Sequence, residues 1–251
     1  MILYEHPLHE RVRTYLRLER LFLRLHQLCQ RVDALDHHFA LATLFEIMDV
    51  AGRADLKSDL LKDLDKQKHV LDGFRGNPAI SEDALSQVID EIDQSFAALN
   101  NQSGKAGQSL NDNDWLMGIR GRMSIPGGTF EFDLPSYFAW QHKCGESRQA
   151  DLLQWTQSLT AMSDAIYLLL RLLRDSGAPQ KVMATGGVFQ QSLPQTRTFL
   201  LMRVALDPHL ECVPEITGNR LMVTVRLTQM GEGNRSTPVN DDVAFELALC
   251  S

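Results

Sequence analysis

The residues best suited to recognition chemistry are arginines that recur along a predicted helix near the N-terminus. At about 100° per residue they fall on one side of that helix, and they are Arg13, Arg17, Arg20, Arg24 and Arg31. A guanidinium presents a planar fork of donors that matches carboxylates and phosphates. The stripe therefore indicates a surface for an anionic partner, with a plain solvated helix face as the alternative interpretation.

Two smaller arginine sets have the same chemistry. Arg220 and Arg226 are expected on the exposed side of a strand over 219–228, and Arg120 and Arg122 stand beside a Pro-Gly-Gly turn. The chain has a formal net charge of -7 and a pI of about 5.6, so these sets would form a local basic surface on an acidic protein. Because phosphate contacts supply most nucleic-acid affinity, an acidic chain is a poor general binder of nucleic acid.

The sequence offers little catalytic or metal-binding chemistry. The paired glycines of PGGTF and TGGVF match neither a P-loop nor a dinucleotide fingerprint. His37 and His38 are adjacent and would point about 100° apart on a helix, and the cysteines show no zinc or disulfide spacing. The segment 111–114 lacks the glycine and the distal glutamate of a calcium loop. We therefore expect no catalytic residue, no metal site and no cofactor.

Apolar residues that recur every third or fourth position predict the helices that must position the first arginine set. The expected helices span 9–32, 35–50, 54–72, 81–99, 110–119, 135–143 and 149–175. Ser81, followed by Glu82 and Asp83, is a suitable cap for the fourth of them. The helix over 149–175 has the strictest apolar seam and should be buried against other helices.

From residue 180 onward the apolar period changes to two, which predicts strands. They are expected over 182–193 with a break at Gly186-Gly187, and over 198–207, 219–228 and 243–249. The short segment 129–132 also reads as extended. The fold class is therefore α+β: a mainly α-helical domain (1–115 and 133–176) and a segregated, mostly antiparallel β domain (116–132 and 177–251) formed largely by the C-terminal part.

The sequence shows no obvious signal that would direct the protein out of the cytoplasm. Its N-terminus lacks the apolar run of a signal peptide, and the apolar stretch 165–173 is short and contains Arg171. We expect a cytoplasmic protein with no membrane insertion. An adaptor that binds another protein is the preferred class of function, since no cluster of catalytic groups is visible. A nucleic-acid-binding protein is the alternative, disfavoured by the low aromatic content of 7%.

Four segments resemble the ZapD family of Z-ring-associated cell-division proteins. They are YEHPLHERVRTYLRLE at the N-terminus, DLLKDLDKQ, RMSIPGGTFEFDLP and the closing FELALCS, in the same order along essentially the whole chain. The resemblance implies a helical domain joined to a β domain, assembled as a homodimer. It also implies a non-enzymatic protein that binds the C-terminal tail of FtsZ and bundles FtsZ filaments at the midcell division ring.

The resemblance also implies a positively charged surface for the tail. Arg17, Arg53 and Arg226 fall where basic residues of that surface are expected. Asp114 and Phe138 depart from the family pattern, since a basic and a polar residue are expected at these positions. The predicted partner-binding set is Arg17, Arg53, Arg220 and Arg226, helped by Arg13, Arg20 and Arg24.

Overall fold

Helices occupy the middle of the chain and strands its end, and one further strand lies at the N-terminus. The computed structural model describes residues 1–52, 55–102, 107–231, 233 and 235–251. The chain divides into unit 1, residues 1–15 and 170–251, and unit 2, residues 16–169. The boundaries fall within α1 (Glu10–Cys29) and α9 (Thr160–Asp175). The predicted α+β fold class is confirmed.

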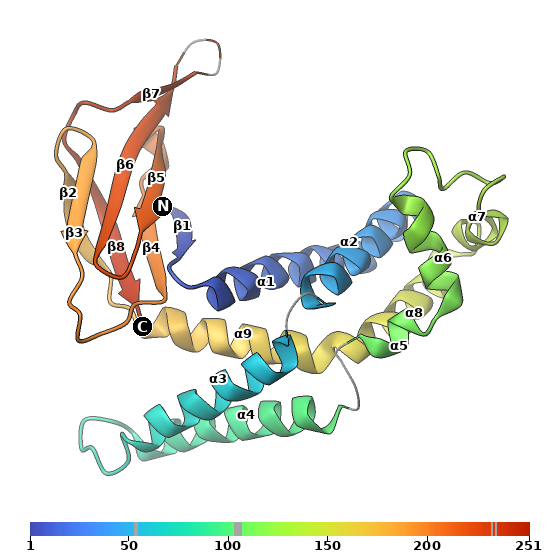
Figure 1. Ribbon diagram of the computed structural model, residues 1–251, viewed down its shortest axis with the longest axis horizontal. Helices are drawn as coiled ribbons and strands as arrows, with labels where there is room; N and C mark the ends of the chain where they lie inside the picture. The colour runs from blue at the N-terminus through green and yellow to red at the C-terminus, as the bar shows by residue number, and fades with distance from the viewer. Residues whose placement is uncertain (53–54, 103–106, 232, 234) are drawn as a thin grey trace. The chain divides into compact units, whose positions relative to one another are not determined.

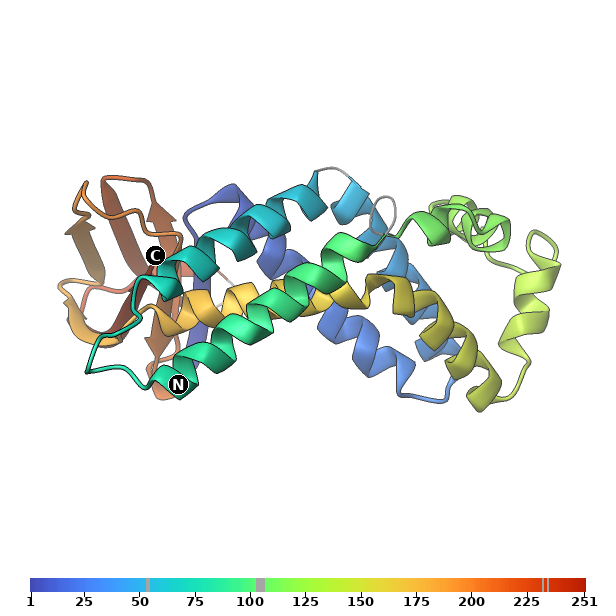
Figure 2. The same cartoon turned by 90° about the horizontal axis from the view of Figure 1, so that it is seen from below.

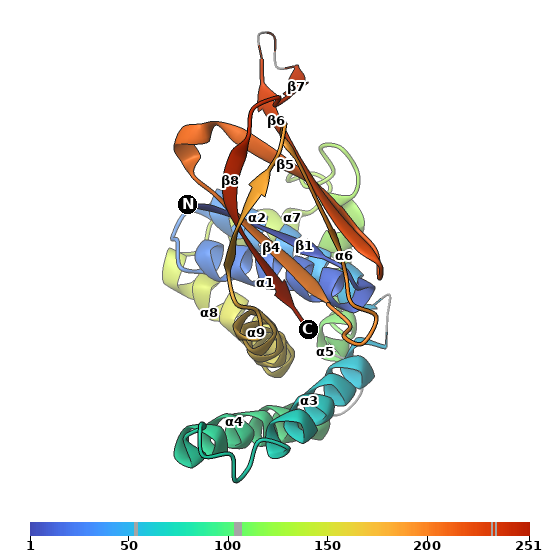
Figure 3. The ribbon, with the colours of Figure 1, turned by 90° about the vertical axis from the view of Figure 1, so that its left-hand side faces the viewer.

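Unit 1 contains two antiparallel sheets (Figure 1). One has the order β1-β4-β8-β2 and the other β3-β6-β5, with β7 paired to β6. The strands are β1 (Ile2–Pro7), β2 (Gln180–Ala184), β3 (Val188–Ser192), β4 (Leu201–Leu206), β5 (Cys212–Gly218), β6 (Met222–Met230), β7 (Ser236–Pro238) and β8 (Val243–Cys250). A short 3-10 helix, η2 (Pro208–Leu210), lies between β4 and β5. Figure 3 shows the β6–β7 pair extending beyond the other strands of its sheet.

The core of unit 1 follows from the alternation of each strand. Val223, Val225 and Leu227 on β6 are fully buried and pack with Phe245 and Leu247 of β8. The alternation of the strand predicted over 219–228 would place Leu221 on the same buried side, but Leu221 is 58% exposed. It lies in the turn before β6, where the Asn219 side chain accepts hydrogen bonds from the backbone N–H groups of residues 221 and 222. Strands β1, β5 and β7 were not predicted.

A carboxylate on β1 ties the end of α9 to the first sheet. Glu5 accepts a bidentate pair from Arg174, with Nε–Oε1 at 2.8 Å and Nη2–Oε2 at 2.7 Å. The Arg203 side chain on β4, directly opposite Glu5 in register, lies 3.3 Å from the same carboxylate. Gly177 follows α9 because a Cβ there would lie 2.5 Å from the Cys250 sulfur. The first sheet is thereby held to the C-terminal turn of α9.

Unit 2 is helical. Besides the parts of α1 and α9 that belong to it, it contains α2 (Ala34–Gly52), α3 (Leu56–Asp72), α4 (Glu82–Asn101), α5 (Gln108–Asn111), α6 (Asp114–Met123), α7 (Pro135–Gln141), α8 (Gly145–Thr156) and η1 (Gln157–Leu159). Ser81 caps α4 as predicted, since its hydroxyl accepts from the N–H of Ala84. Residues 116–132, which the sequence pattern placed with the strands, form most of α6 and a loop of turns.

The prediction of one helix over 149–175 is wrong. The chain changes from α8 to a 3-10 turn and then to α9. Thr156 and Ser158 donate their hydroxyl hydrogens to the carbonyl oxygens of Leu153 and Trp155. Hydroxyl side chains that bond nearby carbonyls bend helices and compete with the regular ladder. The apolar seam continues through the turn, since Leu152, Leu159 and Ile166 are all buried, and this continuity explains why the periodicity alone missed the break.

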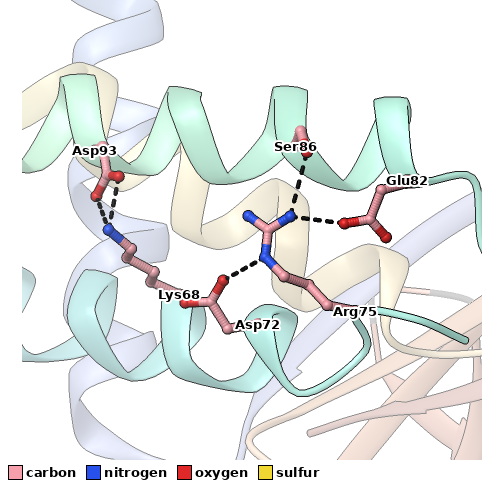
Figure 4. A network of polar contacts seen from close by, with 6 residues as sticks. All are labelled: Lys68, Asp72, Arg75, Glu82, Ser86 and Asp93. Carbon is pink, nitrogen blue, oxygen red and sulfur yellow. Dashed lines mark hydrogen bonds and ion pairs between the residues drawn. The ribbon is translucent and has the colours of Figure 1, made fainter.

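Helices α3 and α4 run antiparallel as a hairpin (Figure 2). Leucines and isoleucines fill the seam between them, and charges bridge the exposed side. The Lys68 ammonium lies 2.6 Å from a carboxylate oxygen of Asp93, and Arg75 binds both Asp72 and Glu82 near the connecting turn (Figure 4). Because these pairs are exposed, solvent and salt screen them, and they contribute little to stability.

The α1–α2 and α7–α8 connections meet at a buried guanidinium. Arg148 on α8 is 5% exposed. It donates to the carbonyl oxygens of Val32 at 2.6 Å and Gln141 at 3.0 Å, and also to that of Lys143. Its Nε donates to Nδ1 of the fully buried His37 at 2.9 Å. One side chain therefore joins the α1–α2 connection, the α7–α8 connection and helix α2.

Replacing Arg148 with methionine should lower the free energy of unfolding by about 3 kcal/mol or more, because three carbonyl groups and the buried His37 would lose their donor. Arg31→Met is the matched control, since Arg31 is exposed and pairs with Asp36 at the surface; it should cost less than about 1 kcal/mol. Urea denaturation followed by circular dichroism measures both. Equal losses in the two variants would show that the Arg148 contacts add no stability.

His37 makes the stability of unit 2 depend on pH. Burial, with a smaller contribution from the charge of Arg148, lowers the pKa of His37 below the ordinary 6.5. As pH falls through about 6.5, the unfolded chain binds a proton that the folded His37 resists, so the free energy of unfolding falls by up to about 1.4 kcal/mol per pH unit.

Denaturation curves at about pH 7.5 and 5.5 test this dependence. His37→Gln should have a shallower pH dependence than the wild type. His69→Gln, at an exposed position of α3, is the control and should keep the wild-type slope. If His37→Gln also kept that slope, His37 would not be the titrating group.

Candidate functional site

The arginine stripe of α1 lies on the exposed side of the helix, opposite buried Tyr15, Phe22 and Leu25. This exposure follows from the spacing, because the arginines and the apolar residues occupy different sectors of one helix. The stripe is not uniformly free, however. Arg13 pairs with Glu10 at 3.1 Å and Arg24 with Glu46 of α2 at 2.7 Å. Arg31, which the sequence pattern placed in the stripe, lies beyond the end of α1 and pairs with Asp36 at 3.1 Å.

Arg17 and Arg20 retain their full donor capacity. Both are exposed, and within the part of the chain that the structure describes neither guanidinium has an ion pair or a side-chain hydrogen bond. They lie three residues apart, which places them on neighbouring positions of the helix surface. The candidate site on unit 2 therefore narrows to this pair, with Arg24 beside it and partly neutralised.

Arg220 and Arg226 lie in unit 1 and are both exposed. Arg226 points away from the core of the β3-β6-β5 sheet and stands opposite Glu215 of β5 and Val188 of β3 in register. Arg220 precedes β6 and lies in the turn held by Asn219. Neither arginine forms an ion pair with any described residue, so both can bind an external anion.

The predicted site residues do not all belong to one unit of the structure. Arg53 lies outside the described residues. Arg13 belongs to unit 1, as do Arg220 and Arg226, whereas Arg17, Arg20 and Arg24 belong to unit 2. The predicted set is thus divided between the two units, and each part is a site of its own unit.

The third arginine set is neutralised inside unit 2. Arg120 forms an ion pair with Asp49 of α2, and Arg122 lies 3.5 Å from Asp133. Asp114 is the first residue of α6, where a carboxylate is favourable at the helix N-terminus. These groups stabilise the local structure and leave little positive charge near the turn that contains Gly127 and Gly128.

Aromatic side chains form a second feature, which the sequence patterns did not indicate. Phe130 and Phe132 lie in the loop between α6 and α7, stacked with their ring centres 5.8 Å apart and their planes within 7°. They are 56% and 78% exposed. Phe138 on α7 is 41% exposed, and its ring centre lies 4.4 Å from that of His142. Because the alternation in TFEF is typical of a strand, the sequence pattern did not indicate that Phe130 and Phe132 are exposed in a loop.

A groove of about 720 Å³ lies on unit 2 between α1, α8 and the first part of α9. Phe22, Leu153 and Tyr167 supply apolar surface, and Cys29 also lines it. Burial raises the pKa of the Cys29 thiol to about 11, so this thiol is protonated at neutral pH and is a poor nucleophile.

Metal-binding clusters and membrane-spanning helices are both absent from the described residues. No group of three or more histidine, cysteine, aspartate or glutamate side chains in those parts of the chain could hold a metal ion. No described helix is long and apolar enough to cross a membrane.

Comparison with known proteins identifies the family. The family model for the cell division protein ZapD matches residues 16–226. Relatives from Ralstonia pickettii and Cupriavidus taiwanensis, both named cell division protein ZapD, are each 52% identical to this chain, and one of the same name from Cupriavidus metallidurans is 51% identical. Each alignment covers 100% of both sequences. The chain therefore belongs to the ZapD family of cell division proteins.

Proposed function

We propose that this chain is a non-enzymatic division factor that binds the C-terminal tail of FtsZ and cross-links FtsZ filaments. On unit 2, Arg17 and Arg20 supply donors for the tail. On unit 1, Arg220 and Arg226 are candidate donors in their own right, and Arg53, Arg13 and Arg24 add positive charge. The proposal rests on one observation above all: Arg17 and Arg20 are exposed and, among the described residues, unpaired.

The physical basis is the chemistry of free guanidinium groups. An arginine already bound to a carboxylate must give up that partner before it can bind a ligand, whereas a free one gives up only water. The arginines without described partners are therefore better suited to carboxylates of a peptide than Arg24 or Arg31. The family membership supports a role in cell division, and this role supports the proposal of the FtsZ tail as the partner.

Cross-linking requires two tail sites in one particle. We propose a homodimer, since one copy of the tail site in each subunit would connect two filaments. A second binding event on the same particle is effectively intramolecular, so avidity can exceed the affinity of one site by a factor of about 10²–10⁴. Sedimentation velocity should show a particle of twice the chain mass of 28.3 kDa. Binding to FtsZ in the cytoplasm would also place the protein at the midcell division ring.

Co-sedimentation with polymerised FtsZ tests the tail site. Removal of the FtsZ tail should abolish pelleting of the protein. Arg17→Glu, Arg20→Glu, Arg53→Glu and Arg226→Glu should each weaken binding about fivefold, which corresponds to about 1 kcal/mol, the upper range for exposed ion pairs. Unchanged pelleting with tail-less FtsZ would refute the proposed binding mode.

Matched charge reversals away from the site control for net charge. Lys62→Glu on α3 and Arg235→Glu near β7 both alter exposed cations, and both should pellet like the wild type. Thermal melting and sedimentation velocity should give wild-type values for the arginine variants. If these variants lost the dimer or the fold, the arginines would have a structural role instead.

The dependence on salt separates charge recognition from apolar anchoring. Because exposed charges are screened over about 8–10 Å at physiological ionic strength, bundling measured by light scattering should fall as salt rises from about 0.05 to 0.3 M. Constant bundling over that range would contradict an arginine-based site. A gel-shift assay with duplex DNA examines the nucleic-acid alternative, which tight binding at low salt would favour.

A further inference from the structure

The loop between α6 and α7, residues 124–134, is held in one shape by turns and an ion pair. The N–H groups of Ile125 and Gly128 donate to the carbonyl oxygens of Arg122 and Ile125, at 3.0 and 2.9 Å. Near the other end, the N–H groups of residues 133 and 134 both donate to the carbonyl oxygen of Phe130. Arg122 and Asp133 close the loop at 3.5 Å. The backbone beneath the phenylalanines is therefore well defined.

Two glycines allow this shape. Gly127 has a φ of +72°, in the left-handed region that favours glycine, and its Cβ position lies 3.3 Å from the ring of Phe130. A Cβ on Gly128 would lie 2.5 Å from the carbonyl oxygen of Arg122. The turn thus lies directly against Phe130 and supports the ring from the backbone side.

The fixed loop holds two large apolar rings in solvent. Phe130 and Phe132 are stacked and are 56% and 78% exposed, and Ile125, which belongs to the same turn, is 47% exposed. Neither ring contributes to the buried core of unit 2, which contains Tyr137 and Trp140 instead. Rigid, exposed aromatic side chains are typical anchors of protein–protein contacts, because they supply a large contact area at a low cost in conformational entropy.

The charge next to the two phenylalanine rings indicates what kind of partner could bind them. Glu131 lies between the two phenylalanines in sequence, is exposed, and has no ion pair or hydrogen bond to a described residue. Asp133 already has Arg122 as its counter-ion. The free carboxylate disfavours an anionic membrane surface and favours a cation, which the faces of aromatic rings also attract.

We infer that Phe130 and Phe132, with Glu131, form a docking site for a peptide segment of a partner protein that places a basic residue next to apolar side chains. The apolar side chains pack on the stacked rings, and the basic residue pairs with Glu131. This chemistry is opposite in charge to that of Arg17 and Arg20, so the site is distinct from the proposed tail site and does not rest on it.

Fluorescence anisotropy with labelled peptides tests the inference on the full chain. The probe is a short glycine- and serine-flanked peptide with a Leu-Phe-Lys core, compared with Leu-Phe-Glu and Ser-Ser-Lys versions. The Leu-Phe-Lys peptide should bind about tenfold more tightly than either, which corresponds to about 1.4 kcal/mol. Equal affinity for the three peptides, or no binding of the first, would overturn the inference.

Substitutions in the loop locate the binding. Phe130→Ser combined with Phe132→Ser should weaken binding about tenfold, whereas Phe74→Ser, at another exposed phenylalanine of unit 2 that is 43% exposed, should have no effect. Glu131→Lys should reverse the preference so that the Leu-Phe-Glu peptide binds more tightly. Because these side chains are exposed, thermal melting should match the wild type, and unchanged binding in the double variant would place the peptide elsewhere.

Two further measurements distinguish this site from a self-association surface and from the arginine surface of α1. Sedimentation velocity of the Phe130/Phe132 double variant should show the wild-type oligomer; loss of the oligomer would mean that the loop contacts a second copy of this chain instead. Arg17→Glu should bind the Leu-Phe-Lys peptide like the wild type, even if it no longer pellets with FtsZ. Loss of peptide binding in Arg17→Glu would contradict a separate site.

Discussion

The arrangement of α1 within unit 2 depends on a buried cation for which none of the described residues supplies a carboxylate. Desolvating a bare guanidinium costs several kcal/mol unless its donors are satisfied. Arg148 meets that requirement with main-chain carbonyl oxygens, those of Val32, Gln141 and Lys143, and with Nδ1 of His37. The carbonyl of Gln141 belongs to the last residue of α7, and that of Val32 follows the end of α1 by three residues. Carbonyl groups at helix C-termini have partial negative charge, so main-chain dipoles, among them the one at the end of α7, take the role that a counter-ion has elsewhere.

This constraint acts together with the amphipathic spacing of α1, which turns the arginine stripe outward in unit 2. With the end of α1 tied to α8, the apolar sector of the helix is fixed against the core, and the opposite sector is left to solvent. Whether each arginine on that sector has a partner then depends on the carboxylates near it. Glu46 of α2 is close enough to pair with Arg24, and Asp36 is close enough to pair with Arg31. Arg17 and Arg20 have no such neighbour among the described residues, so the packing of α2 determines which arginines remain available.

Local sequence patterns predicted most of the helices and several strands, but they did not predict which elements and side chains contact one another. The helix predicted over 9–32 is observed over Glu10–Cys29, because amphipathic spacing is a property of neighbouring residues. Strand β1 was missed because it is stabilised by pairing with β4, nearly the whole chain away in sequence. Arg148 could not be recognised as buried, since its acceptors come from segments distant in sequence. The exposure of the arginine stripe could be predicted from spacing, but the division into paired and free members depends on α2 and could not. Phe130 and Phe132 alternate with acidic residues as a strand would, and only the turns of their loop show that both rings are exposed.

The two candidate surfaces would respond differently to solution conditions, and this difference limits what each can contribute to recognition. Free arginines attract any flexible anion, and the attraction weakens as salt screens it. Contact with the stacked rings of Phe130 and Phe132 removes apolar surface from water, which salt does not weaken. A partner that met only the arginines would be bound loosely and with little discrimination. A partner with a cation beside apolar side chains would be repelled by the arginines and accepted at Glu131. Charge of opposite sign at the two proposed sites would therefore keep their ligands separate.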